Sequence, residues 1–144
     1  VSRDFWTPAH QRRLFLFVDE ESTPYDDVGN IDESVMQKIR QNIQYLHTYL
    51  LGEGLAIDSL EFQATEQLFM NTLNRGRQLI LNSGGDRSDV NLPDLCDVSV
   101  DFEGENLRDV NGEYTRLYQD RQYVIRAWMA VLAYLLSDYK FLYT

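Results

Sequence analysis

The sequence predicts an all-α protein, mainly a four-helix, mostly antiparallel bundle, formed as a single helical domain over residues 1–144. Three observations lead to this fold class. Apolar residues recur at alternating steps of three and four along several stretches. Residues typical of helix ends, such as Thr7-Pro8 and Gly52, separate those stretches. The apolar fraction of 44% in 144 residues is enough to build one core, and no repeat or Pro/Gly-rich linker divides the chain.

The first two helices are predicted from their ends and their apolar spacing. Thr7 followed by Pro8 resembles an N-cap with proline at the first helical position, which predicts a helix over about 8–20 that stops before Pro24. Asn30 or Asp32 caps a second helix that ends near residue 51. Its expected buried stripe is Met36, Ile39, Ile43, Leu46 and Leu50.

The last two helices follow from the same signals. Asp58, with Glu61 three residues later, resembles a capping box and opens a helix to about residue 81. Its expected stripe is Leu60, Ala64, Leu68, Phe69, Leu73 and Ile80, with Gly76 as a weak point. Asn111-Gly112 opens the last helix, over about 112–141, which is the longest of the four.

An acidic segment over 86–109 forms the crossover before the last helix, and it is long for a loop. Val98, Val100 and Phe102 alternate with polar residues, which predicts a short β-strand or hairpin near 98–102. The predicted acidic surface consists of Asp94, Asp97, Asp101, Glu103 and Glu105. Their spacing does not follow the calcium loop of EF-hands, so a solvated surface is the expected role.

Composition limits the function classes. The net charge of −10 makes direct nucleic-acid binding unlikely except locally. One cysteine, Cys96, and two histidines cannot form a standard zinc site, and we expect no metal and no cofactor. The most apolar stretch, 124–136, contains Arg126 and is too short to cross a membrane. No secretory-signal pattern opens the chain, so we expect a cytoplasmic protein.

Motifs of catalysis are scarce. The phosphate-loop, dinucleotide, nucleophile-elbow and zincin motifs are all missing. Arg40, His47 and Tyr49 form the pattern Arg-x6-His-x-Tyr, which resembles the signature of the HEPN ribonucleases. The resemblance implies a metal-independent ribonuclease in which Arg40 binds phosphate, His47 acts as acid or base and Tyr49 assists. The other interpretation is a helix-surface histidine beside a core stripe.

Aromatic residues crowd the C-terminal part of the chain, and aromatic residues are enriched in protein interfaces. The candidate protein-interface residues are Trp128, Tyr134, Tyr139, Phe141 and Tyr143. For Trp128, burial in the core is the stronger expectation.

With no catalytic constellation, we expect a non-enzymatic interaction module, a small subunit or adaptor of a larger protein assembly. Its partner is another protein subunit or a second copy of the chain. The alternatives are the HEPN-like ribonuclease and an acidic inhibitor that mimics nucleic acid.

Overall fold

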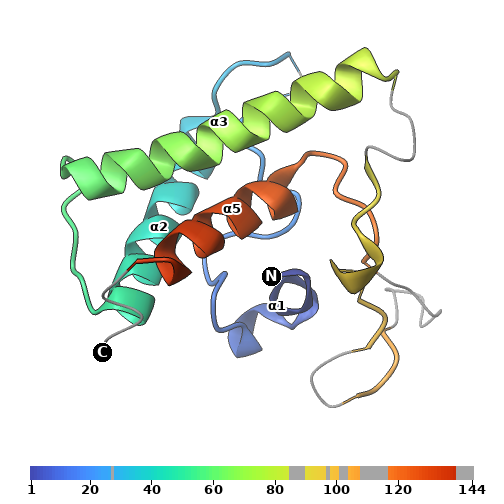
Figure 1. Ribbon diagram of the computed structural model, residues 1–144, viewed down its shortest axis with the longest axis horizontal. Coiled ribbons are helices and arrows are strands. Elements are labelled where there is room, and N and C mark those ends of the chain that lie inside the picture. Colours follow the sequence, from blue (N-terminus) through green and yellow to red (C-terminus); the bar gives the residue numbers. More distant parts are fainter. Residues whose placement is uncertain (27, 85–89, 97, 101–103, 108–116, 139–144) are drawn as a thin grey trace.

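The structure is a computed structural model that describes residues 1–26, 28–84, 90–96, 98–100, 104–107 and 117–138. It is mainly helical, as predicted, and the described residues contain no β-sheet (Figure 1). None of the described helices is long and apolar enough to cross a membrane. The elements are α1 (Ser2–Trp6), the 3-10 turn η1 (Ala9–Gln11), α2 (Glu33–Leu51), α3 (Leu60–Asn82), the 3-10 turn η2 (Asp94–Cys96) and α5 (Val124–Leu136).

The N-terminal segment is not the helix predicted over 8–20. Thr7 ends α1 instead of capping a new helix, and only the short turn η1 follows it. The carboxylate of Asp4 accepts hydrogen bonds from the backbone N–H groups of Arg13, Leu14 and Phe15. The guanidinium of Arg12 donates to three carbonyl oxygens of the same segment. These side chains satisfy backbone groups that a helix would have paired, so the segment folds as an ordered loop.

Helix α2 agrees closely with its prediction. Asp32 is the N-cap, its carboxylate accepting hydrogen bonds from the N–H groups of Ser34 and Val35, and Gly52 ends the helix in the left-handed conformation at φ 69°. Of the five predicted stripe residues, all but the half-buried Leu50 are buried.

The N-cap of helix α3 lies one residue later than predicted, and the buried stripe of the helix is displaced. Ser59, not Asp58, is the N-cap, with its hydroxyl oxygen accepting from the N–H of Phe62. Leu60 and Ala64 are exposed, contrary to prediction. The observed stripe is Phe62, Thr65, Phe69, Leu73 and Gly76. A polar threonine and a glycine occupy buried positions of this stripe, which is why apolar spacing alone misplaced it.

Helix α5 is much shorter at its start than the predicted helix over 112–141. Residues 117–123 lie outside any helix, while 112–116 and 139–141 are outside the described residues. The buried carboxylate of Asp120 accepts hydrogen bonds from the N–H groups of Ile125 and Arg126, the first turn of the helix. This anchor and the positive φ of 63° at Tyr123 set the start of α5 at Val124.

The predicted strand near 98–102 is represented by isolated β-bridges, and residues 101–103 are outside the described part. Val98 pairs with Leu117, and Val100 pairs with Asn106. Val98 is buried and Ser99 is exposed, as the alternation predicted. These pairings join the segment before α5 to the crossover without forming a sheet in the described residues.

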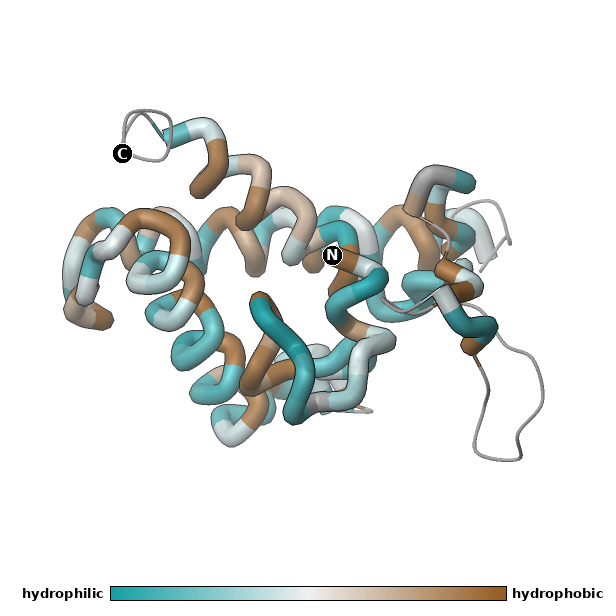
Figure 2. The backbone as a smooth tube through the Cα atoms, turned by 90° about the horizontal axis from the view of Figure 1, so that it is seen from below, coloured by the Kyte–Doolittle hydropathy of each residue, from teal (hydrophilic) through white to brown (hydrophobic). Residues whose placement is uncertain are grey.

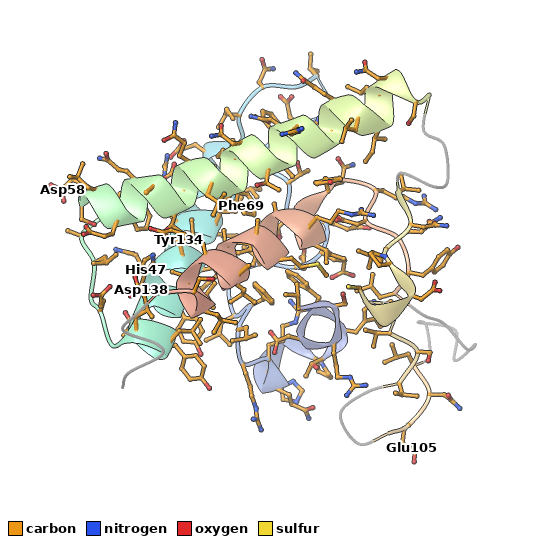
Figure 3. The ribbon with its side chains drawn as sticks, in the orientation of Figure 1. His47, Asp58, Phe69, Glu105, Tyr134 and Asp138 are labelled. Carbon is orange, nitrogen blue, oxygen red and sulfur yellow. The ribbon has the colours of Figure 1, made fainter. Side chains whose placement is uncertain are left out.

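The core lies where α5 packs against α3 and, less extensively, against α2. Figure 2 shows α5 as almost entirely hydrophobic to neutral along its length, in keeping with its buried position. Trp128 of α5 contacts the ring of Phe69 on α3 at 4.6 Å between centroids and the ring of Phe15 at 5.4 Å. Phe15 in turn stacks on Phe5 of α1 at 4.2 Å. Figure 3 shows Phe69 on α3. This aromatic line joins the N-terminal segment to α5 and α3.

Candidate functional site

Arg40 lies on α2 with its guanidinium between two carboxylates. Its Nη1 is 2.6 Å from Glu33 Oε1, and its Nη2 is 3.0 Å from Glu66 Oε1 on α3. Hydrogen bonding to Glu66 raises the pKa of Arg40 above its usual value, so the group is a permanent cation. A phosphate would have to displace both carboxylates from the guanidinium, and it would be repelled by them.

His47 is buried in the contact between α2 and α3, with 2% of its surface exposed. Its Nε2 lies 2.9 Å from the hydroxyl oxygen of Thr65, and that hydroxyl donates to the carbonyl oxygen of Glu61. When the threonine hydroxyl donates to Glu61, Nε2 is the nitrogen that carries the proton and donates to Thr65. The other ring nitrogen, Nδ1, lies 4.0 Å from Glu53 Oε2. The interpretation as a helix-surface histidine is therefore corrected: the side chain is in the interior and faces α3.

Tyr49 is exposed over 55% of its surface and stacks on Tyr45, one turn earlier in α2, at 5.5 Å. Phe17, exposed over 43% of its surface, meets Tyr45 edge-on at 6.3 Å. The hydroxyl of Tyr45 donates to the carbonyl oxygen of Arg13, which fixes the middle ring against the N-terminal segment. We call Phe17, Tyr45 and Tyr49 the aromatic row.

The three residues that resemble the HEPN signature thus have separate surroundings. Arg40 binds Glu33 and Glu66, His47 binds Thr65 inside the protein, and Tyr49 belongs to the aromatic row. A catalytic histidine must reach the proton that it moves, at about 3 Å or through one water. A substrate in solvent cannot reach the His47 ring as it stands here.

The five residues of the predicted C-terminal interface fall into three groups in the structure. Trp128 is completely buried, so its assignment to an interface is corrected to a core position. Tyr134 is 45% exposed, on α5 (Figure 3), and is available to a partner. Tyr139, Phe141 and Tyr143 lie outside the described residues.

The predicted acidic surface is described only at two of its five positions. Asp94 and Glu105 are exposed. Figure 3 shows Glu105 at the opposite end of the molecule from His47. Asp97, Asp101 and Glu103 lie outside the described residues. In the part of the chain that the structure describes, no group of three or more His, Cys, Asp or Glu side chains is placed to hold a metal ion.

Two adjoining hollows lie beside α1, and sequence reasoning did not identify them. The larger, of about 500 Å³, is lined by Trp6, Glu20, Glu21, Leu117, Gln119, Arg121 and Gln122. The other, of about 430 Å³, shares Trp6 and Glu20 with it. Burial raises the pKa of Glu20 above its usual value. The lining residues are far apart in the sequence and form no motif, so only the fold brings them together.

The aromatic row was also missed, although Tyr45 and Tyr49 at a spacing of four on a predicted helix were a usable signal. Phe17 could not have been added, because it was assigned to a helix that does not form.

No protein-family model, no curated protein and no solved structure matches the chain.

Proposed function

We propose that the protein is a non-enzymatic interaction module, a helical-bundle subunit or adaptor of a larger assembly, and that the aromatic row is part of its interface. The observation that carries the proposal is the exposure of Phe17 and Tyr49 on either side of the anchored Tyr45. Exposed rings that are already held in place lose little conformational freedom on binding, which favours association.

The mostly antiparallel bundle and the cytoplasmic location belong to the same proposal. The bundle is supported by the contact between α3 and α5 and by their opposite directions in Figure 1. The location is supported by the single cysteine, which excludes an intramolecular disulfide within this sequence.

The geometry favours this function over the ribonuclease, because His47 is buried and Arg40 binds two carboxylates. Loss of RNA cleavage on His47→Ala, in a protein that keeps its fold, would reverse that preference. Mimicry of nucleic acid rests on the net charge of −10 alone and predicts association with a basic protein that weakens steeply with salt.

A photo-crosslinking experiment tests the interface. A photoreactive phenylalanine analogue at Tyr49 should give a defined crosslinked species, either a dimer of this chain or a complex with one partner. The same analogue at Leu81, which is 76% exposed at the C-terminal end of α3, is the matched control. Equal, unspecific crosslinking from both positions would refute the role of the aromatic row.

Light scattering then separates self-association from binding of another subunit. A dimer that becomes a monomer in Tyr49→Ala, with an unchanged circular dichroism spectrum, identifies a second copy as the partner. If the unsubstituted chain is a monomer, and the analogue at position 49 crosslinks to one other protein, the partner is a different subunit.

A further inference from the structure

The side chain of Glu20 is partly buried beside α1. Together with Trp6, it forms the shared wall of the two hollows there. Among the residues that the structure describes, no basic side chain lies within ion-pair distance of it. Because this carboxylate is partly removed from water and has no described cation within ion-pair distance, a cationic ligand beside it would stabilise its charged form.

Arg12 lines the smaller hollow and Arg121 the larger one, but both donate their hydrogen bonds to groups other than Glu20. Arg12 donates from Nε, Nη1 and Nη2 to the carbonyl oxygens of Thr7, Val18 and Phe5. Arg121 is exposed, and its Nε and Nη2 both donate to Gln119 Oε1. Because Arg121 is exposed, water screens its charge.

Trp6 supplies the apolar wall of the same space. Its only side-chain nitrogen, Nε1, is buried, so every accessible atom of its side chain is carbon. An aromatic surface beside a carboxylate can bind an organic cation through two interactions, a cation–π contact with the ring and an ion pair with the carboxylate. Glu21, also at the wall of the larger hollow, adds a second negative charge.

We propose that the hollow between Trp6 and Glu20 binds an alkylammonium group, with the ammonium at the Glu20 carboxylate and the carbon chain along Trp6. A volume of about 500 Å³ lies within the range of small-molecule sites. The group can come from a free amine or from the lysine side chain of a protein. This site is separate from the aromatic row and does not depend on the interface proposed there.

The test uses the ¹⁵N-labelled chain, in which the two tryptophan indole N–H signals are followed by NMR. Butylammonium chloride should shift the signal of Trp6 and leave that of Trp128, which is fully buried in the core, unchanged. Butanol, of the same shape without the charge, should not bind. In Glu20→Gln the dissociation constant for butylammonium should rise by up to about fivefold, the loss expected for one solvent-accessible ion pair.

A second arm identifies the source of the ammonium. A short Gly-Lys-Gly peptide with an acetylated N-terminus and an amidated C-terminus, with its acetyl-lysine form as control, is titrated in the same way. Tighter binding of the lysine peptide than of butylammonium assigns the site to a protein side chain, and the reverse order assigns it to a free amine. No shift of Trp6 with either ligand overturns the proposal, as does equal binding of butanol or unchanged affinity in Glu20→Gln.

Lower pH provides a readout that does not require a variant. The charged groups that act on Glu20 are Asp19, Glu21 and Arg12, and burial raises its pKa. As the pH falls through this raised pKa, the carboxylate becomes neutral and the affinity for butylammonium should fall. Binding that stays constant down to the ordinary pKa of a glutamate would contradict the role of Glu20.

Discussion

Asp4 and Arg12 determine the path of the N-terminal segment through bonds to the backbone. Asp4 is buried and accepts three backbone N–H groups, while Arg12 donates to three carbonyl oxygens. Neither set of bonds could be predicted from spacing, because the backbone partners lie in a loop, where hydrogen bonds follow no regular period in the sequence. The predicted helix over 8–20 failed for this reason.

Asp4→Asn should therefore destabilise the protein by about 1–3 kcal/mol. The substitution replaces one of the two accepting oxygens by an NH2 group, so at least one backbone N–H group loses its acceptor. Urea unfolding measures the change. Asp94→Asn is the control, since Asp94 is exposed, and surface substitutions of this kind stay within about 0.5 kcal/mol. An equal effect of the two substitutions would show that the Asp4 bonds contribute nothing.

Gly76 is required by a close approach and not by its backbone angles. A Cβ at this position would overlap the ring of Tyr123, and Tyr123 itself has a φ of 63°. Gly76→Ala should cost about 1–3 kcal/mol through overpacking, which exceeds the gain of about 1 kcal/mol in helix propensity. Thermal and urea unfolding measure the difference.

The Tyr123→Gly background provides the control for that prediction. Removing the ring opens the space, and glycine also suits the positive φ, so Gly76→Ala should then stabilise the protein. Gly54→Ala, where nothing lies within 4 Å, should be close to neutral in either background. A destabilising Gly76→Ala without the Tyr123 ring would contradict the steric explanation.

At the scale of elements, α2 and α3 were predictable because their ends and spacing are local in the sequence. Asp32 and Gly52 set α2 as expected. The start of α5 was not predictable, because Asp120 acts from outside the helix and residues 117–119 are engaged in bridges with Val98 and Asn91. Tyr49 was found by its motif, but its role in the aromatic row depends on Phe17, which the fold brings next to α2.

The N-cap of α3 offers a direct test at this scale. Ser59→Ala should lower the free energy of unfolding by about 1 kcal/mol, because the N–H of Phe62 loses its acceptor. Asp58→Ala, at the neighbouring residue that the capping-box pattern had favoured, should change it by less than about 0.5 kcal/mol. If urea unfolding shows a larger loss of stability for Asp58→Ala than for Ser59→Ala, Asp58 is the N-cap instead.

At the scale of the whole molecule, the aromatic line from Phe5 through Phe15 and Trp128 to Phe69 connects segments that are far apart in the chain. All four rings are buried. A core shared in this way should couple the N-terminal segment to α3 and α5, and the prediction of one domain over residues 1–144 requires such coupling.

Coincident unfolding transitions would confirm that coupling. In Trp128→Phe, Trp6 is the remaining tryptophan of the two in the sequence, so its fluorescence reports on the N-terminal segment while far-UV circular dichroism reports on the helices. One domain requires the same urea midpoint from both probes. Trp128→Ala should cost about 3–5 kcal/mol and lower both midpoints together, since it removes the ring that joins Phe15 to Phe69. Loss of the Trp6 signal at a urea concentration where the helices persist would mean that the N-terminal segment unfolds independently, and the aromatic line would then be a contact between two units instead of one core.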